Sequence, residues 1–236
     1  MQNQYDNSTA NLREYVFTEG ISNLVHEKFL KYIGETESSG RILDIGTGNG
    51  YILREIQKRY PGRYLLIGID NSPEMLAKAN SFSGGIDYKL ADNYHLPFNE
   101  DYFSTITAKN VTRFSSKELG RVLQEGGLFV FREYGEGKGL VEIARLFPDR
   151  LIRSRKPDYY IRQLNNAGFK DISVEQFTLQ RKYAQNELLK IIRMFPFIED
   201  LNDSDLEKIN DFYEGKEVIE VTSDPFILTA RRSKND

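Results

Sequence analysis

The fold of this chain is decided by the stretch Arg41-Ile-Leu-Asp-Ile-Gly-Thr-Gly-Asn-Gly-Tyr-Ile-Leu-Arg-Glu-Ile56. Its apolar residues Ile42, Leu43 and Ile45 predict a buried strand, and the apolar residues after Gly50 recur at helical spacing. Between them, glycines at alternating positions form a turn without side-chain bulk. A strand, a glycine turn and a helix together let a ligand lie directly against backbone N–H groups.

The spacing of these glycines separates two classes of cofactor. A dinucleotide fingerprint requires G-x-G-x-x-G, in which the third glycine lets the helix pack closely against the strand. Here the spacing is G-x-G-x-G, and Tyr51 occupies the position of that third glycine. Asp44 also stands two residues before the first glycine, where an uncompensated carboxylate would repel a pyrophosphate. This end of the strand instead suits a ligand that carries positive charge or hydrogen-bond donors.

Residues 41–50 resemble motif I of the class I S-adenosylmethionine-dependent methyltransferases, whose ligand carries a sulfonium and an ammonium group. The resemblance covers residues 40–134 well and the remainder in outline. It implies an α/β fold with a doubly wound, mostly parallel sheet of seven strands, the last one antiparallel, and with helices on both faces. It also implies that S-adenosyl-L-methionine is the cofactor. The implied cofactor contacts in this stretch are Asp44, Gly46, Thr47 and Gly48.

An acidic residue ends the next predicted strand. The apolar run 65–69 closes at Asp70, and Ser72-Pro73 then has the form of a helix start. A strand-terminal Asp is by itself more often a helix cap than a ligand. At this distance after the glycine turn, however, the resembled family has its ribose ligand. The resemblance therefore implies that Asp70 accepts the ribose hydroxyls and that Asn71 also contacts the cofactor.

A third landmark, Ala91-Asp-Asn-Tyr-His-Leu-Pro-Phe98, follows a strand predicted at 86–90. The resembled family commonly shows a small residue, an Asp, a few variable positions and Leu-Pro-Phe at this point. The resemblance implies that Asp92 accepts the adenine amino group and that the backbone of Asn93 approaches the ring. His95 occupies a variable position of the pattern, so we expect a solvated histidine rather than a catalytic base.

The strand predicted at the start of 103–114 leads toward the methyl acceptor in the resembled family. For Lys109 we expect a cofactor contact mainly through the backbone, because an ammonium beside a sulfonium is unfavourable. The candidate acceptor-binding residues of the chain are Tyr15, Asn110, Arg113 and Tyr134. The next residues, Ser115-Ser-Lys-Glu118, have the spacing of a capping box that opens a helix.

The composition excludes several kinds of chemistry. At 236 residues, one large α/β domain with an elaborated edge is expected. The chain has no cysteine, which excludes a disulfide framework, a thiolate nucleophile and a thiolate metal site. With two histidines we expect no metal site, and the net charge of −3 gives no general attraction to nucleic acid. We expect a cytoplasmic protein without a membrane span, since no apolar run approaches ~20 residues and the first residues lack signal-peptide features.

The methyltransferase domain is predicted to comprise residues 40–236. We expect residues 1–39 to form a lid over the cofactor and a helix from about residue 19 to residue 33. Insertions are predicted at about 137–156 and 181–223. The first is rich in arginine, whose planar guanidinium suits a carboxylate or phosphate on the acceptor. A charged helix face is the favoured explanation for such a run, and Arg150 and Arg153 are the residues to test.

The second insertion separates strands predicted at 169–179 and 224–231, which the resembled fold joins by a short hairpin. Helical patterns occur at 186–195 and 203–213, and their residues are too apolar for a solvated loop. We therefore predict a helical insertion. Its apolar residues have three open roles, namely a roof over the acceptor, a homodimer contact, and packing against the sheet edge, which is favoured.

The sequence thus predicts an S-adenosylmethionine-dependent methyltransferase that moves a methyl group to an O or N atom of a small molecule or short natural-product peptide, with carbon left open. The acceptor is expected to be anionic or amphipathic rather than a nucleic acid. No catalytic residue is assigned, because only an acceptor that must lose a proton needs a base. The candidates for that role are His95, Asn110, Glu133 and Tyr134.

Two other classes of function stay open. One is a non-catalytic partner subunit that binds S-adenosylmethionine, because Ser104 and Arg113 depart from the pattern of the resembled family. The other is an NAD-dependent oxidoreductase, which Asp44 and Tyr51 disfavour for the reasons given above.

Overall fold

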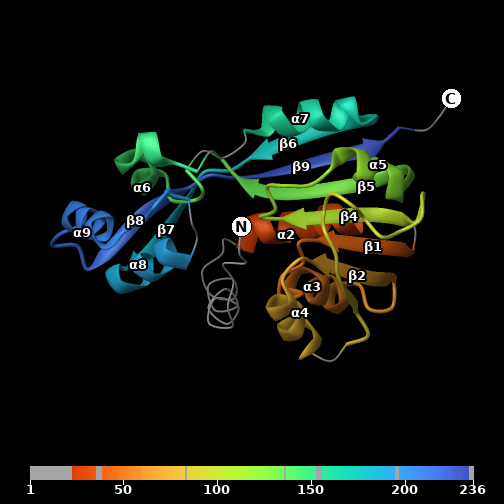
Figure 1. Ribbon diagram of the computed structural model, residues 1–236, viewed down its shortest axis with the longest axis horizontal. Coiled ribbons are helices and arrows are strands. Elements are labelled where there is room, and N and C mark those ends of the chain that lie inside the picture. Colours follow the sequence, from red (N-terminus) through yellow and green to blue (C-terminus); the bar gives the residue numbers. More distant parts are fainter. Residues whose placement is uncertain are drawn as a thin grey trace. The chain divides into compact units, whose positions relative to one another are not determined.

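The computed structural model describes residues 23–35, 39–82, 84–135, 137–152, 156–194 and 197–233, and it divides into two compact units (Figure 1). The first unit comprises Met1–Glu133, Tyr159–Glu175 and Ile227–Asp236. The second comprises Tyr134–Asp158 and Gln176–Phe226 and therefore contains both stretches predicted as insertions. The expected N-terminal lid falls on residues that lie outside the described part.

The first unit is built on a seven-stranded sheet in the order β3-β2-β1-β4-β5-β9-β6 (Figure 1). The strands are β1 (Gly40–Ile45), β2 (Tyr64–Asp70), β3 (Asp87–Leu90), β4 (Phe103–Lys109), β5 (Leu123–Tyr134), β6 (Phe169–Gln176) and β9 (Pro225–Arg232). Those from β3 to β5 pair in parallel. β9 runs antiparallel to β5. The Gly135 N–H after β5 donates to the carbonyl of Asp224 before β9, and the Arg232 side chain at the end of β9 donates to the carbonyl of Leu123 at the start of β5. The predicted seven-stranded, mostly parallel sheet is confirmed.

The described helices of the first unit connect these strands, except α2, which precedes β1. They are α2 (Asn23–Gly34), α3 (Tyr51–Arg59), α4 (Pro73–Asn80), α5 (Ser116–Val122) and α7 (Pro157–Asn166). The connections β1–β2, β2–β3 and β4–β5 each contain a helix, as expected for parallel neighbours, which a tight hairpin cannot join. No helix in the ranges given above is long and apolar enough to cross a membrane.

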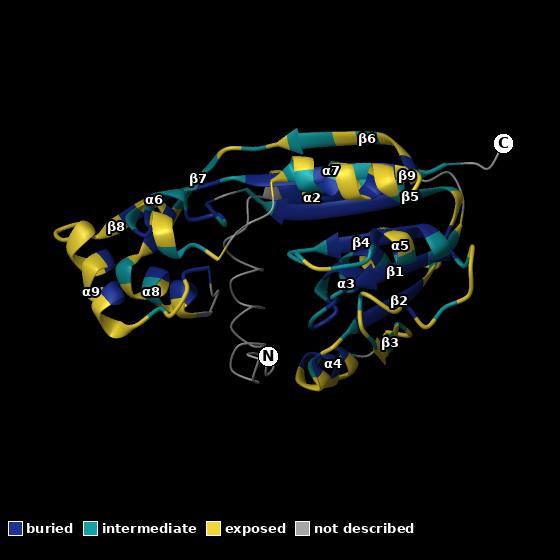
Figure 2. Cartoon of the chain, turned by 45° about the horizontal axis from the view of Figure 1, so that its top comes forward, coloured by how far each residue is buried: buried dark blue, intermediate teal, exposed yellow. Residues whose placement is uncertain are grey.

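The centre of this sheet is buried on both faces. Six consecutive residues of β4, from Phe103 to Ala108, are buried, and so are the last four residues of β1 (Figure 2). Because successive side chains of a strand point to opposite faces, such runs require cover on both sides of the sheet. Phe131 of β5 packs against Tyr160 of α7 with ring centroids 4.7 Å apart, which shows one of these contacts.

The start of α5 differs from the capping box that the sequence predicts. Ser115 does cap the helix, since its side chain accepts from the Glu118 N–H at 3.2 Å. The Glu118 carboxylate instead accepts from the Leu96 N–H at 2.9 Å and pairs with Arg121 at 2.8 Å. Arg121 in turn donates to the carbonyl oxygens of Leu96 and Phe98. The Ser115 N–H, which a capping box would use, donates to the carbonyl of Asn93 at 3.2 Å, so the Glu118 carboxylate instead holds the loop before β4 to α5.

The second unit is a mixed α/β structure. Its elements are α6 (Val141–Leu146), the 3-10 helix η1 (Pro148–Arg150), β7 (Leu179–Ala184), α8 (Gln185–Met194), α9 (Asp203–Phe212) and β8 (Val218–Ser223). β7 and β8 form a two-stranded antiparallel sheet. The segment predicted as helical thus contains two helices with a strand on either side, and the sequence analysis missed both strands. The apolar residues Leu188, Ile192 and Ile198 are buried within this unit, which supports the packing role.

Arg150 is held by its own unit rather than presented to a ligand. Its guanidinium makes a bidentate pair with Asp205 at 2.7 and 2.9 Å. It also donates to the carbonyl oxygens of Glu199 and Asp200. These bonds join η1 to the start of α9, and the proposed role of Arg150 in acceptor binding loses its support. Arg153 lies outside the described residues.

We expect Glu118→Gln to lower the free energy of unfolding at pH 7 by about 1–3 kcal/mol, because it removes charge-assisted hydrogen bonds to Arg121. The Arg121 hydrogen bond lowers the pKa of Glu118 from its usual 4.5 to about 2. This stability is therefore present above the unfolded pKa and is lost as the pH falls through the folded one. Urea unfolding at neutral and at acid pH measures the effect, with the exposed Glu217→Gln as control. Equal midpoints for the two variants at pH 7 would contradict it.

Candidate functional site

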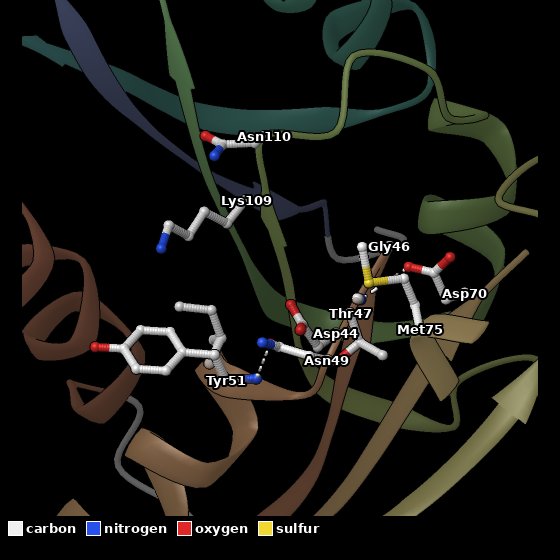
Figure 3. Close-up of a pocket in the computed structure, with 11 residues that line it drawn as sticks. Asp44, Gly46, Thr47, Asn49, Tyr51, Asp70, Met75, Lys109 and Asn110 are labelled. Atoms are coloured by element: carbon white, nitrogen blue, oxygen red, sulfur yellow. Dashed lines mark hydrogen bonds between the residues drawn. The ribbon is translucent and has the colours of Figure 1, made fainter. Parts of the chain in front are cut away.

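A cleft opens in the first unit where β1, β2 and β4 end (Figure 3). It is lined by Asp44, Gly46, Thr47, Gly48, Asn49, Tyr51, Ile52, Asp70, Met75, Lys109 and Asn110. These residues come from the ends of the three strands, the glycine turn and the first turns of α3 and α4. β1 lies between β2 and β4, where the strand order reverses, and ligands of doubly wound sheets bind at such a point.

The turn after β1 requires glycine at three positions. Gly46, Gly48 and Gly50 have φ angles of 62°, 56° and 76°, in the left-handed region that other residues rarely adopt. A Cβ at Gly46 would lie 2.5 Å from Val111 Cγ2, and one at Gly50 would overlap the hydroxyl of Tyr88. At Gly48 no atom lies within 4 Å of that point. The first and last glycines allow close packing, whereas Gly48 leaves the cleft open.

Asp70 joins this turn to the next helix. One carboxylate oxygen accepts from the Gly48 N–H at 2.8 Å, and the other accepts from the Ser72 N–H at 2.9 Å. Ser72 caps α4 by accepting from the Met75 N–H at 3.2 Å. A carboxylate oxygen can accept more than one hydrogen bond, so these two bonds do not by themselves exclude a ligand. The structural role of Asp70 and the predicted ligand role are therefore compatible.

Asp44 is a carboxylate inside the protein, with 2% of its surface exposed. The Thr107 hydroxyl donates to its Oδ1 at 2.7 Å. Burial raises the pKa of Asp44 to about 6, although the hydrogen bonds and the cation of Lys109 oppose the rise. A cationic or donor-rich ligand would stabilise the ionised form by replacing the water that burial removes.

Lys109 presents its side chain to the cleft, which differs from the expectation that it contributes mainly its backbone. Its Nζ lies 5.2 Å from the centroid of the Tyr51 ring, and the face of that ring attracts the ammonium (Figure 3). Tyr51 stacks on His26 of α2 with ring centroids 5.4 Å apart, and its hydroxyl lies 3.4 Å from Nε2. Burial lowers the pKa of His26 to about 4, with help from the cations Lys109 and Arg132. His26 is therefore neutral at pH 7.

Three of the predicted cofactor residues do not line the cleft, namely Asn71, Asp92 and Asn93. Asn71 directly follows Asp70 at the end of β2. The Ala91 N–H donates to the carbonyl of Asp70 at 3.0 Å, so the residues after β3 start at the same edge of the sheet as the cleft.

The loop after β3 is held by contacts of its own. Asp92 accepts from the Tyr94 N–H at 3.0 Å, and its other oxygen lies 3.6 Å from Nδ1 of His95. The Asn93 amide donates to the carbonyl of Arg113 at 3.4 Å. The side chain of His95 is 88% exposed, as expected for a solvated histidine.

The candidate acceptor residues that the structure describes lie on different elements and are divided between the two units. Asn110 lines the cleft, in the left-handed region at φ 58°. Arg113 is exposed in the loop after β4. Tyr134 belongs to the second unit, where its hydroxyl accepts from Arg181 at 3.3 Å. Tyr15 lies outside the described residues.

Sequence reasoning missed four residues that line the cleft, namely Asn49, Tyr51, Ile52 and Met75. Tyr51 and Ile52 begin α3, and Met75 lies in the first turn of α4. For Tyr51, Ile52 and Met75 a signal existed, since each stands just after a predicted helix start, whereas Asn49 lies within the glycine turn itself. The first turns of helices that follow neighbouring parallel strands face the ligand edge of the sheet.

The polar groups of the cleft fit a ligand that is rich in donors and carries positive charge. In the residues that the structure describes, Nδ2 of Asn49, a donor, and Oδ1 of Asn110, an acceptor, are buried without a hydrogen-bond partner. A ligand that offers one acceptor and one donor at these points would satisfy both. Asp44 and Asp70 provide acceptors, and Gly48 leaves room for the ligand beside the backbone. No group of three or more His, Cys, Asp or Glu residues in the same ranges could hold a metal ion.

The chain is similar to proteins of one enzyme class. Residues 42–127 match the family described as a methyltransferase domain. The ubiquinone/menaquinone biosynthesis C-methyltransferase UbiE of Geotalea daltonii is 31% identical over 176 residues, which are 60% of this chain and 75% of that protein. The malonyl-[acyl-carrier protein] O-methyltransferase of Geobacter sulfurreducens is 25% identical over 194 residues, which are 74% of this chain and 71% of that protein.

Solved structures share the fold. The YcgJ protein of Bacillus subtilis matches with a TM-score of 0.62 at 18% identity, covering 89% of this chain and 100% of that chain. Phosphoethanolamine N-methyltransferase 2 of Haemonchus contortus, in complex with S-adenosyl-L-methionine, matches with a TM-score of 0.65 at 17% identity. That match covers 99% of this chain and 59% of the other. At these identities the likeness concerns the fold alone.

We expect Gly50→Ala to destabilise the protein more than Gly48→Ala. Both substitutions place a side chain in the left-handed region at a cost of about 1 kcal/mol. At Gly50 the added methyl group must also displace the hydroxyl of Tyr88, which adds about 1–3 kcal/mol. Urea unfolding followed by circular dichroism measures the difference. Gly62→Ala, at φ 71° with no atom within 4 Å of the added carbon, is the control for the backbone cost alone.

The same unfolding midpoint for Gly50→Ala and Gly62→Ala would show that Tyr88 does not restrict the turn.

Proposed function

Because the chain belongs to the class I S-adenosylmethionine-dependent methyltransferases, we propose that it methylates an O, N or C atom of a small molecule or short natural-product peptide. The chain is an enzyme of this class with S-adenosylmethionine as its cofactor. The observation that carries the proposal is the buried Asp44 beside a glycine turn that leaves the cleft open at Gly48. One relative is named a C-methyltransferase and the other an O-methyltransferase, which supports carbon and oxygen as acceptor atoms. Nitrogen is retained as an acceptor atom because the sequence analysis predicts it.

We propose that the cleft residues divide the cofactor between them by chemistry. Asp44 would hold a positively charged part of it, and Asp70 would accept from the ribose hydroxyls. Asp92 and Asn93 stay the proposed partners of the adenine, because their loop starts beside Asp70 at the same edge of the sheet. Lys109 is held against the ring of Tyr51, which supports a role as a wall of the cleft.

The bound cofactor supplies an electrophilic methyl group on a sulfonium. The residues of the chain have to align the acceptor with that group and exclude water, and alignment alone contributes ~7–11 kcal/mol to lowering the barrier. An acceptor that is already a neutral amine or an anion needs no base. Of the four candidates for a base, His95 is solvated. Asn110 lines the cleft, but its carboxamide is not basic, and no catalytic base is assigned.

The additions to the domain have unequal support. We propose that 137–156 and 181–223 are insertions, because the family match covers 42–127 and both stretches belong to the second unit. The proposed anionic acceptor has no support from Arg150, which Asp205 engages. The proposed homodimer contact has none from the apolar residues of α8, of which Leu188 and Ile192 are buried within their own unit.

Transfer of label from methyl-labelled S-adenosylmethionine tests the proposal. The full chain is incubated with the labelled cofactor and a library of metabolites and short peptides, and the products are separated by mass. The proposal predicts a labelled small molecule together with S-adenosylhomocysteine. Binding of the cofactor without transfer to any acceptor would favour the non-catalytic partner subunit instead.

We expect Asp44→Asn to weaken the binding of S-adenosylhomocysteine at about pH 7.5 at least tenfold, or about 1.4 kcal/mol, because the ammonium of the ligand loses a carboxylate. Burial raises the pKa of Asp44 to about 6, so binding to the parent protein should tighten as the pH rises through that value. The variant should lose this dependence. Isothermal titration calorimetry from about pH 5 to about pH 8 measures both effects.

Thr107→Val is the matched control, because it removes the hydrogen bond that favours the ionised form of Asp44. Its binding profile should move to higher pH and keep its shape.

The stability of the ligand-free protein should change with pH in the opposite direction from ligand binding. Folding raises the pKa of Asp44, so the stabilising contribution of the protonated side chain is present below pH 3.8 and is lost as the pH rises through about 6. Asp44→Asn should therefore be at least as stable as the parent at neutral pH. If Asp44→Asn bound S-adenosylhomocysteine with the affinity and the pH dependence of the parent protein, Asp44 would not belong to the binding site.

A further inference from the structure

One arginine of the second unit, Arg181, has two phenol hydroxyls as its side-chain partners. Arg181 lies on β7, with Nη1 3.4 Å from the hydroxyl of Tyr183 and Nη2 3.3 Å from the hydroxyl of Tyr134. Its Cζ lies 5.8 Å from the centroid of the Tyr134 ring. Within the described ranges no carboxylate lies at ion-pair distance from it. Ion pairs with a carboxylate do occur for Arg59, Arg121, Arg150, Arg193 and Arg232.

The register of the two-stranded sheet brings a serine to the same face. Arg181 stands opposite Val221, and Leu179 stands opposite Ser223. Alternate residues of a strand share a face, so Ser223 is a diagonal neighbour of Arg181. The surroundings of Gly139 show independently that Tyr134 and Ser223 lie close together. A Cβ there would lie 2.8 Å from the ring of Tyr134 and 3.3 Å from Oγ of Ser223.

Two donors of this group have no acceptor. Nε of Arg181 and Oγ of Ser223 are buried, and neither has a hydrogen-bond partner in the part of the chain that the structure describes. Ser223 is fully buried. Natural proteins satisfy the great majority of such atoms, so each one calls for an explanation. The hydroxyl of Tyr183 adds a third donor, since a phenol oxygen that accepts from a guanidinium can still donate its own O–H.

A half-buried cation without an anion is unfavourable, and an arginine fork matches the geometry of a carboxylate or phosphate. We propose that Arg181, Tyr183 and Ser223, with the ring of Tyr134 as a wall, bind an oxyanion in the second unit. The ligand is the carboxylate or phosphate group of a small molecule. This site lies entirely within the second unit and does not rest on the proposed methyl transfer.

Thermal unfolding of the full chain tests the site with inorganic phosphate and with acetate as probes, each compared with chloride at equal ionic strength. A ligand that binds the folded state alone raises the melting temperature saturably with its concentration. We expect one or both oxyanions to do so beyond chloride. A rise with phosphate alone assigns the site to phosphate, and a rise with acetate alone assigns it to carboxylates.

Arg181→Met should reduce the apparent affinity for the oxyanion at least tenfold and leave the melting temperature in chloride unchanged or higher, because it removes an unpaired cation. A purely structural arginine would instead lower the melting temperature in chloride. Ser223→Ala, which removes only one hydroxyl, should reduce the affinity about threefold. Lys182→Met changes an exposed cation on the next residue of β7 and should retain the full response.

The proposal is overturned if neither oxyanion stabilises the parent protein beyond chloride. It is equally overturned if Arg181→Met and Lys182→Met respond to the oxyanions in the same way.

Discussion

The carboxylate of Asp70 holds the glycine turn and the start of α4 in one arrangement, through its bonds to the N–H groups of Gly48 and Ser72. β1 and β2 are parallel neighbours in which Ile45 is paired with Ile69, so both strands deliver their ends to the same edge of the sheet. The turn makes a second bond to β2, from the Thr47 N–H to the carbonyl of Ile69 at 2.8 Å. The cleft keeps its form because the turn is bonded to the neighbouring strand and helix.

Within that frame, the charge of Asp44 decides which ligand the cleft accepts. A raised pKa of about 6 means that the ionised side chain costs about 3 kcal/mol at neutral pH relative to a solvated carboxylate. A cationic ligand recovers part of that cost, whereas a pyrophosphate would add to it. Lys109 is kept against the ring of Tyr51 on another wall, so the cleft has distinct acidic and basic sides. This arrangement fits the cofactor of the family to which the chain belongs.

The predicted cofactor residues that line the cleft are those fixed by local pattern. Asp44, the glycines and Asp70 stand at strand ends that the apolar runs define, and the parallel sheet then brings them together. Met75 follows the predicted helix start at Ser72-Pro73, but which side chain of that first turn enters the cleft depends on how α4 meets the sheet. β7 and β8 were missed because their pairing joins segments about forty residues apart in a polar context. The partner of Arg150 is equally remote, since Asp205 lies 55 residues further along the chain.

We infer that the acidic, glycine-lined cleft selects an adenosyl ligand that carries an ammonium group over a dinucleotide. Calorimetric titration of the unmodified full chain with S-adenosylhomocysteine and, separately, with NAD tests it most directly. We expect saturable heat for S-adenosylhomocysteine at one site per chain and no saturable heat for NAD. Saturable binding of NAD, with none of S-adenosylhomocysteine, would contradict it.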